Sequence, residues 1–294
     1  STSAITINGL RNTVKGNNVK NAFLGISIAQ VGSGMFDATD SVVEGNIISR
    51  ISGSAITANG QATSGLSIRG NIITEILGSS TAEGISISER HQNIIIDGNI
   101  FKNIPGNAIR FTGSLSGGVS QNNQITNNII NNWGMASGTV FTKSAIMIRN
   151  TAPTTTVMRT FTVAGNKIGE PSVSGCTALL IQNLVDSFVA NNNTLGYGAA
   201  SGVVMSGFNN QSVANSGTIF HFNVFQSGDI FGSTGNITLS GVTAIRQLSG
   251  LNWTGAFTSG GVSGGSGASY SGMIPQGYLN IQISGSTVKI PFFN

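Results

Sequence analysis

Short apolar stretches that alternate with polar residues recur along most of the chain. One kind follows a small residue, as at 25–28, 84–87 and 108–111, and another leads into a Gly-Asn pair, as at 66–68. Alternation at a period of two in β-branched residues predicts β-strands. A third short stretch follows the Gly-Asn pair, as at Ile47-Ile48. The pattern therefore predicts three short strands in each repeat and almost no helix.

The Gly-Asn pair itself recurs at a near-constant interval. The asparagine that anchors each copy stands at positions 17, 46, 71, 99, 128, 166 and 192, so the steps are 29, 25, 28, 29, 38 and 26 residues. A period of this length is typical of a solenoid. Three strands in each repeat predict a single-stranded parallel β-helix of about eight coils, and we expect the right-handed form. We expect each asparagine at a left-handed bend, hydrogen-bonded along the axis.

The repeat also assigns positions to bulky residues. Five positions after successive anchoring asparagines stand Ile51, Ile76, Ile104 and Trp133. This column predicts that Trp133 lies in the core, and a sugar-stacking platform is the alternative. The longest coil, 128–166, is about ten residues longer than its neighbours. We expect the insertion to project from the rod, where binding is common.

The register fades near Gln226 and divides the chain into two predicted regions. Residues 1–225 form the β-helix, and residues 226–294 form a small C-terminal β-rich capping and trimerisation region. Residues 278–294 alternate as two strands around a Ser-Gly-Ser turn. A lone hairpin is marginal in water. We therefore expect self-association around a symmetry axis to bury the terminal phenylalanines.

Composition excludes several classes of protein. Charged residues make up 8% of the chain, against about 25% in ordinary domains. The net charge of +4 is spread without a basic cluster, which argues against a nucleic-acid partner. A hydrophobic content of 39% argues against disorder. No apolar run approaches the roughly 18 residues of a membrane span, so we expect no membrane insertion.

Motifs for metals, cofactors and nucleophilic catalysis are absent from the sequence. The single cysteine, Cys176, excludes an internal disulfide and is expected in the core. No Cys/His metal spacing, phosphate-binding loop or nucleophile triad occurs, so we expect no metal and no cofactor. The chain begins at Ser1 with neither an initiator methionine nor a signal-peptide pattern. We therefore expect a processed product or a fragment.

The final residues, 278–293, carry a recognisable ending. They read Tyr-Leu-Asn-Ile-Gln-Ile-Ser-Gly-Ser-Thr-Val-Lys-Ile-Pro-Phe-Phe. This ending resembles the C-terminus of bacteriophage tailspikes and tail fibres, in which a hydrophobic strand, a short glycine turn and a final Lys-Ile-Pro-aromatic close a trimer. The repeat region is similar to their pectate-lyase-like right-handed parallel β-helix, although many β-helices share the Gly-Asn-x-Ile signal.

The resemblance implies a function. The family members are homotrimers that bind cell-surface polysaccharide and often cleave it by hydrolysis or β-elimination. For this chain it implies a location in the virion tail, attachment to the tail or baseplate through a missing N-terminal part, and action on host capsule or O-antigen. The scarcity of acids favours binding alone, whereas the family favours depolymerisation. A bacterial surface or secreted β-helix adhesin is the alternative from another class.

Glycoside hydrolysis requires two carboxylates, so the ten acidic residues define the candidates. Glu44, Arg69 and Asp97 occupy one outward column, just before the Gly-Asn pairs. Glu44 and Asp97, two coils apart, could form an inverting pair, but a ladder of opposite charges is the favoured interpretation. Arg50 and Glu75, in adjacent coils, are expected to form a salt bridge.

A second candidate is Glu83, which precedes a strand of the first kind. Its column neighbours are Ser54 and Asn107, so the column offers it no charged partner. Arg110 and Arg149 project from strands of the same kind. Both could donate hydrogen bonds to the carboxylates or hydroxyls of a sugar.

The polar run 88–92 is the most suggestive stretch, and we predict that it forms a connecting loop. Counting back from the asparagines gives Asp37 and Arg90 the same offset, and Asp40 follows three residues later. An acid/base pair supported by Arg and His could act there, and a solvated loop is the alternative. The catalytic candidates are Glu89, Glu83, Asp97 and Asp37, and the substrate-binding candidates are Arg90, His91, Arg110, Arg149 and Asp40.

Overall fold

The computed structural model describes most of the repeat region and the C-terminal hairpin. The described residues are 3–29, 39–113, 119–135, 139, 142–151, 157–169, 171–173, 176–182, 184, 188–191, 193–197, 205–210, 218–221, 224–225, 229–231, 277–283 and 286–292. They form strands, turns and connections without any helix, so this part of the chain is all-β. A helix long and apolar enough to cross a membrane is accordingly not found among them.

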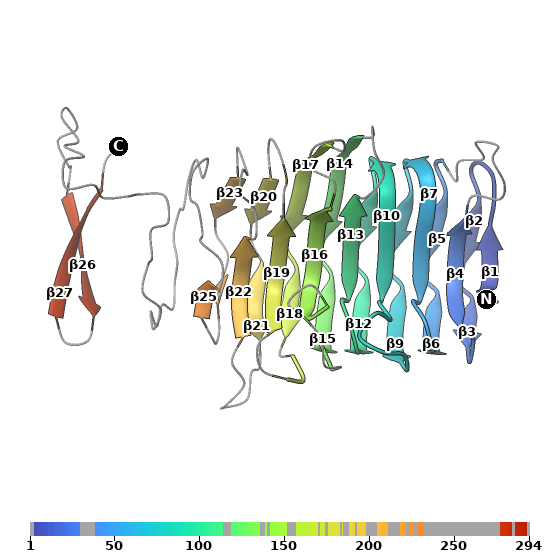
Figure 1. Ribbon diagram of the computed structural model, residues 1–294, viewed down its shortest axis with the longest axis horizontal. Helices are drawn as coiled ribbons and strands as arrows, with labels where there is room; N and C mark the ends of the chain where they lie inside the picture. Colours follow the sequence, from blue (N-terminus) through green and yellow to red (C-terminus); the bar gives the residue numbers. More distant parts are fainter. Residues whose placement is uncertain are drawn as a thin grey trace.

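Three strands recur in a fixed order along the rod (Figure 1). The first strands of the coils are β1 (Ser3–Ile7), β4 (Leu24–Ala29), β7 (Ile56–Ser64), β10 (Ile85–Gln92), β13 (Ile109–Gly113), β16 (Ser144–Asn150), β19 (Cys176–Gln182), β22 (Met205–Asn210) and β25 (Asp229–Phe231). The second are β2 (Thr13–Lys15), β5 (Val42–Glu44), β8 (Ser67–Arg69), β11 (Ile95–Asp97), β14 (Val119–Thr126), β17 (Val157–Ala164), β20 (Phe188–Asn191) and β23 (Thr218–His221). The third are β3 (Asn18–Lys20), β6 (Ile47–Ile51), β9 (Ile72–Ile76), β12 (Ile100–Ile104), β15 (Ile129–Trp133), β18 (Lys167–Gly169), β21 (Thr194–Tyr197) and β24 (Val224–Phe225).

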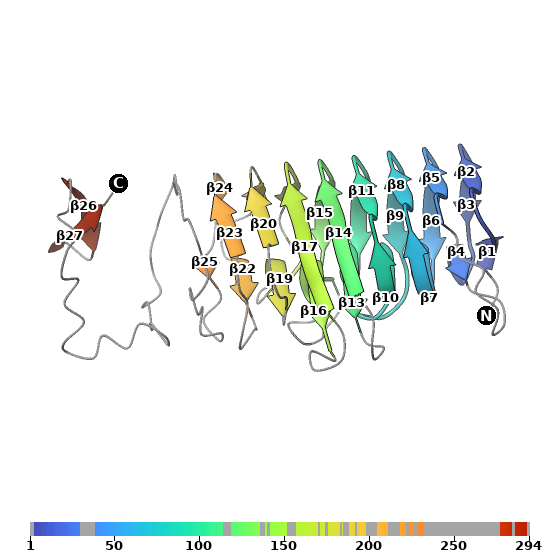
Figure 2. The same ribbon diagram turned by 90° about the horizontal axis from the view of Figure 1, so that it is seen from above.

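Each strand pairs in parallel with the equivalent strand of the next coil (Figure 2). The third strands form an 8-stranded sheet. The first and second strands join one 17-stranded sheet, because the long strands β10 and β14 also pair, at Gln92 and Gln121. This stacking of parallel strands is consistent with the predicted parallel β-helix. It continues past residue 225, since β25 pairs with β22.

The coils bend where the backbone is left-handed. The glycine of the Gly-Asn pair has φ between +60 at Gly70 and +69 at Gly16, and Asn127 takes the same place with φ +55. A Cβ atom on Gly16 or Gly70 would meet nothing within 4 Å. Backbone conformation, not lack of space, therefore explains glycine in the repeated pair. The predicted left-handed bend is confirmed.

A row of asparagines, buried from Asn46 onward, follows this bend through successive coils. The Oδ1 atom of Asn99 accepts hydrogen bonds from the backbone nitrogen and Nδ2 of Asn71, at 3.0 and 2.9 Å. The same pair of bonds links each remaining step of the row. Its members are Asn17, Asn46, Asn71, Asn99, Asn128, Asn166 and Asn193. The predicted row is confirmed except at its last member. That member is Asn193 and not Asn192, because three consecutive asparagines made the sequence spacing ambiguous.

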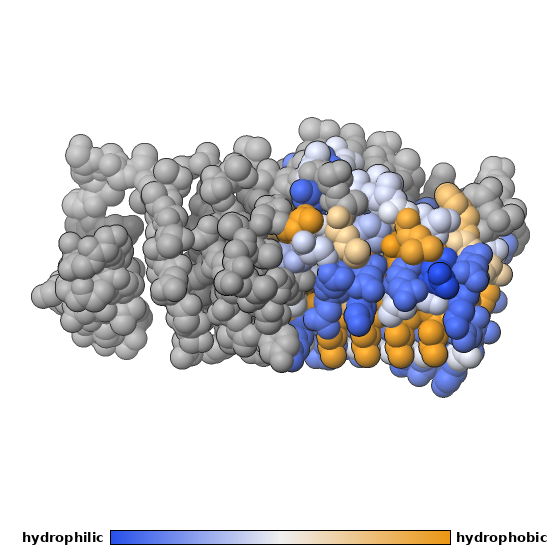
Figure 3. Space-filling model, turned by 90° about the horizontal axis from the view of Figure 1, so that it is seen from below, coloured by the Kyte–Doolittle hydropathy of each residue, from blue (hydrophilic) through white to orange (hydrophobic). Residues whose placement is uncertain are grey.

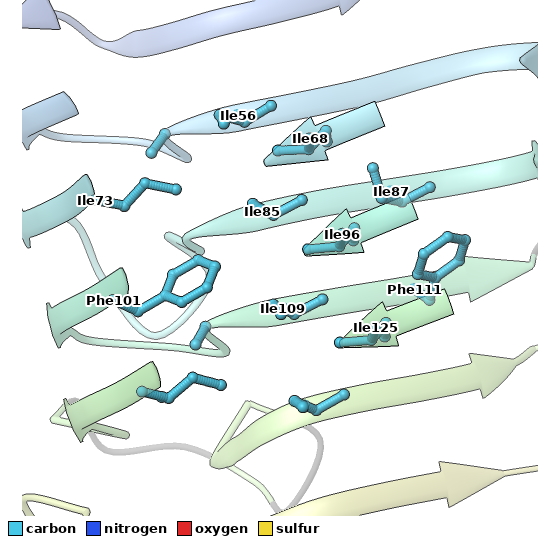
Figure 4. Close-up of a cluster of buried hydrophobic side chains, with 14 of the residues drawn as sticks. Ile56, Ile68, Ile73, Ile85, Ile87, Ile96, Phe101, Ile109, Phe111 and Ile125 are labelled. Atoms are coloured by element: carbon cyan, nitrogen blue, oxygen red, sulfur yellow. The ribbon is translucent and has the colours of Figure 1, made fainter. Parts of the chain in front are cut away.

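Columns of apolar side chains fill the interior, and within a column equivalent strands of successive coils contribute one residue each (Figure 4). Ile56, Ile85 and Ile109 stack in register along the first strands. Trp133 is fully buried and donates from Nε1 to the carbonyl of Gly169 at 3.0 Å. Its predicted core position is therefore confirmed, and the sugar-platform alternative is wrong because the ring has no exposed face. Cys176 is buried and free, as expected.

The C-terminal segment forms an antiparallel hairpin of β26 (Gly277–Ile283) and β27 (Ser286–Phe292). Ile283 pairs with Ser286 across the turn, so the predicted two-strand hairpin is confirmed. The parallel rod and this hairpin use different pairing geometry, because a two-residue turn can join only antiparallel strands.

Candidate functional site

Glu83 lies two residues before the start of β10 and is 3% exposed. Its backbone nitrogen donates to Oγ of Ser54 at 3.2 Å, and its carbonyl accepts from Ala55. On the next coil, the carbonyl of Asn107 accepts from Gly84. The predicted column of Ser54, Glu83 and Asn107 therefore exists, and all three residues are buried.

A guanidinium from the next coil reaches this buried carboxylate. Nη1 of Arg110 lies 2.9 Å from Oε1 of Glu83, and the side chains are 36% and 5% exposed. Nε of Arg110 donates to Oγ1 of Thr112 at 2.8 Å. The pair is thus asymmetric, with the carboxylate inside and the guanidinium at the surface. Sequence columns did not reveal it, because Arg110 extends across the coils to residue 83.

Burial and the contact with Arg110 act in opposite directions on the carboxyl group of Glu83. Burial raises the pKa of its carboxyl above the ordinary value of 4.5, while Arg110 and a hydrogen bond to Ser86 oppose this shift. A carboxyl pKa that burial raises is one feature of general acids. The contacts of Glu83 within the described residues include no second carboxylate.

The outer face of β13, β16 and β19 continues the site along the rod. Thr112, Arg149 and Gln182 occupy one row in parallel register. Nε of Arg149 donates to Oε1 of Gln182 at 2.6 Å. Burial, and then the charge of Arg110, lower the pKa of Arg149, so the two guanidinium groups are electrostatic neighbours. Aligning the first strands by sequence would have predicted this row, although the sequence reasoning did not single out Thr112 or Gln182.

The row that contains Arg110 continues as covered apolar residues on β16 and β19. Met147 is in register with Arg110, and Leu180 follows Met147 on β19. Both alternate with inward-facing aliphatic residues, yet they are 2% and 0% exposed. These two side chains are therefore covered, although they face away from the core.

The outward column before the Gly-Asn pairs is a charge ladder. Glu44 contacts Lys15 at 3.3 Å and Arg69 at 3.4 Å. Asp97, in register with Arg69, accepts hydrogen bonds from Oγ1 of Thr126 at 2.6 Å and from Nδ2 of Asn127 at 2.9 Å. The favoured interpretation of a ladder is confirmed for Lys15, Glu44 and Arg69. The expected contact between Arg50 and Glu75 is present at 4.0 Å.

The prediction that residues 88–92 form a connecting loop is wrong. They belong to β10, because the strand alternation continues through this polar run. The pairing of β10 with β7 shifts register between Glu89 and His91. His91 is fully buried, and its Nε2 is hydrogen-bonded to the carbonyl of Ser88. Burial lowers the pKa of His91 to about 4. The side chains of Glu89 and Arg90 lie outside what the structure describes.

The remaining members of the predicted edge cluster are Asp37 and Asp40. Asp37 lies outside the described residues, whereas Asp40 is exposed at a left-handed bend with φ +55. Because His91 is interior and Asp40 is exposed, these two do not share a surface. The structure instead brings together Glu83, Arg110 and Arg149. Within the described part of the chain, no group of three or more His, Cys, Asp or Glu side chains could hold a metal ion.

No protein-family model matches the sequence, and the curated proteins contain no match to it.

Proposed function

We propose that the chain binds bacterial surface polysaccharide, as the rod of a bacteriophage tailspike that acts at the host cell surface. The observation that carries the proposal is the Glu83–Arg110 pair with Arg149 beside it on the outer face of β13 and β16. Guanidinium, hydroxyl and amide groups along a sheet face can donate to successive sugars of an extended chain. The resemblance of the C-terminal ending to tailspikes and tail fibres supports the same function.

The proposal includes the finer architecture. We expect the parallel stack to wind as a right-handed β-helix of about eight coils, with residues 226–294 as a trimerisation region. The homotrimer would attach to the virion tail or baseplate through an N-terminal part that precedes this sequence. A bacterial surface or secreted adhesin with the same rod remains the rival class.

Self-association is supported by an exposed apolar row on the 8-stranded sheet (Figure 3). Ile47, Ile72, Ile100 and Ile129 are in register on successive coils and are 44%, 39%, 39% and 38% exposed. An apolar row of this length is unusual on a soluble monomer and is typical of contact surfaces. We expect Ile72→Lys with Ile100→Lys to shift the mass measured by light scattering from trimer to monomer. An unchanged mass would remove this row from the subunit contact.

A second candidate function, cleavage of the bound polysaccharide, is favoured by the raised pKa of Glu83. In hydrolysis the Glu83 carboxyl group would protonate the oxygen of the leaving sugar. A second group must then act as nucleophile or base. Asp37 and Glu89 remain the candidates from the sequence, and the position of Asp37 and the side chain of Glu89 lie outside the described part of the chain. Binding without cleavage, as in a tail fibre, is the alternative.

Incubation with purified host capsule or O-antigen tests both functions. Binding is measured by sedimentation or surface plasmon resonance, and cleavage by the appearance of oligosaccharides. We expect Glu83→Gln to lose product formation, while Glu44→Gln, an exposed glutamate paired with Arg69, retains it. Glu89→Gln and Asp97→Asn test the remaining acids. Binding without product would leave the recognition function and exclude cleavage, and absence of both would overturn the proposal.

A further inference from the structure

The corner of the rod at the Gly-Asn bends carries two exposed columns, one charged and one apolar. The charged column includes Glu44 and Arg69, which are in register and have side chains that are 29% and 52% exposed. Three positions after each stands the apolar column, with Ile47 and Ile72 at 44% and 39% exposed. Both columns are therefore open to a partner that approaches this corner.

The other margin of the 8-stranded sheet carries a second pair of columns. Arg50 and Glu75 occupy equivalent left-handed positions, with φ +55 and +54, and their side chains are 61% and 54% exposed. Two positions later, backbone hydrogen bonds align Ser52 with Phe23 on one side and Leu77 on the other. Phe23 and Leu77 are 51% and 62% exposed. This margin thus repeats the combination of a charged column beside an apolar one.

We propose that a second copy of this chain docks its Glu44–Arg69 and isoleucine columns against the Arg50–Glu75 and Phe23–Leu77 columns of the first. The two rods lie parallel and level, coil against equivalent coil. The inference rests on the proposed self-association and names the two surfaces that meet. Each copy presents both surfaces, so repetition of the contact about a three-fold axis closes a trimer.

The axial repeat of the rod favours a copy of itself as the partner. Each column presents one side chain for each coil, and parallel strands of successive coils lie about 4.8 Å apart. A partner can match consecutive coils only if it repeats at the same spacing, as a second copy does. Level rods place Ile72 of one copy against Leu77 of the other, since both residues belong to the coil of β9. Burial of these exposed side chains drives the association.

The order of the charges selects the parallel and level arrangement. In the coil of β5 and β6 one surface carries Glu44 and the other carries Arg50. In the coil of β8 and β9 they carry Arg69 and Glu75. Level parallel copies therefore set opposite charges against each other in both coils. Antiparallel copies, or a shift by one coil, would set like charges against each other, which is unfavourable at an interface.

Cysteine crosslinking tests this arrangement. A chain with both Ile72→Cys and Leu77→Cys is treated with a short bismaleimide and separated under denaturing conditions. The two sites of one chain are roughly 15 Å apart along the strand direction, which is beyond the reach of such a reagent. We therefore expect covalent dimers and trimers. Cys176 is fully buried, so the wild type should give no crosslinked product.

Ile72→Cys and Leu77→Cys alone are the matched controls, because each places a cysteine on only one of the two surfaces. Neither should crosslink. Product from Ile72→Cys alone would mean that like columns meet, and it would overturn the inference.

A charge exchange tests the direction of the rods. Arg50→Glu with Glu75→Arg, introduced into the chain with two cysteines, keeps the composition and the pair within the chain but sets like charges across the contact. Crosslinked product should fall about tenfold. Addition of Glu44→Arg with Arg69→Glu restores opposite signs and should restore the product. Unchanged crosslinking after the first exchange would overturn the inference.

Light scattering separates this inference from the proposed function. A trimer that gives no crosslink in the chain with two cysteines would overturn the docking surfaces and leave self-association intact. A monomeric wild type would overturn both the docking surfaces and the trimer. Binding of capsule or O-antigen is measured separately and reports on polysaccharide recognition alone.

Discussion

Two glutamate–arginine pairs on the same 17-stranded sheet have opposite surroundings. In the charge ladder, Glu44 and Arg69 are 3.4 Å apart and their side chains are 29% and 52% exposed. In the candidate site, Glu83 and Arg110 are 2.9 Å apart and are 5% and 36% exposed. Contacts with Lys15 and Arg69 lower the pKa of Glu44, whereas burial raises that of Glu83. The same chemical pair is therefore solvated in one place and buried on its carboxylate side in the other.

The difference follows from position in the coil. Glu44 stands before a glycine bend, where the side chain projects into water and its partners come from the same column. Glu83 stands before β10, in a column where Ser54 and Asn107 are also buried. Surface ion pairs contribute little to stability, but a buried carboxylate must be satisfied by its partners. Burial, and not the presence of a partner, separates the candidate site from the scaffold.

Removing each glutamate tests this distinction most strongly. Glu83→Ala leaves Arg110 half-buried without its carboxylate and opens a polar cavity. We expect a loss of about 2–3 kcal/mol in the free energy of unfolding, below the full cost of breaking a buried pair because Arg110 is partly exposed. Chemical denaturation followed by circular dichroism measures the change.

Glu44→Ala is the control for this experiment. Its unfolding midpoint should shift far less than that of Glu83→Ala, since both of its cationic neighbours remain solvated. Equal shifts in the two variants would show that burial does not distinguish the pairs.

The repeated scaffold could be predicted from sequence because its signals are local. The Gly-Asn spacing gave the asparagine row, and counting five positions onward placed Trp133 in the core. The last member of the row is Asn193, because its Oδ1 is the one among three adjacent asparagines that accepts the hydrogen bonds from Asn166. Spacing alone cannot make that choice.

The candidate site was only partly predictable, for two physical reasons. Sequence columns align backbone positions, whereas the contact between Arg110 and Glu83 depends on how a long side chain extends between coils. The polar residues 88–92 indicated a loop, yet β10 continues through them and His91 lies in the interior. A single polar residue such as His91 does not extend the apolar alternation of the strand, so the sequence did not predict that it is buried.

His91 extends the comparison to a buried base. Its folded-state pKa of about 4 lies below the ordinary value of 6.5. As the pH falls through 6.5, the unfolded chain binds a proton that the folded chain excludes, so stability is lost with acidification. The linkage predicts a decrease of about 2 kcal/mol between pH 7 and pH 5. Unfolding measured at the two pH values tests this expectation.

The chain contains two histidines, so an NMR titration gives an independent check. The imidazole signal that disappears in His221→Ala identifies the other as His91. We expect the His91 signal to remain that of the neutral ring down to about pH 4. A midpoint near 6.5 would contradict its burial and remove the predicted acid sensitivity.

The smallest expected effect is also the most direct test of the two glutamates. Because the folded-state pKa of Glu83 is raised, its contribution to stability is complete below pH 4.5 and is lost as the pH rises through the folded-state value. The lowered pKa of Glu44 gives the opposite sign, and its contribution is lost as the pH falls below 4.5. Relative to Glu83→Gln, the wild type should therefore become less stable with rising pH above 4.5. Relative to Glu44→Gln, it should become less stable with falling pH below 4.5. Parallel pH profiles for the two variants would mean that both carboxylates share one environment, and Glu83 would then lose its claim to act as an acid.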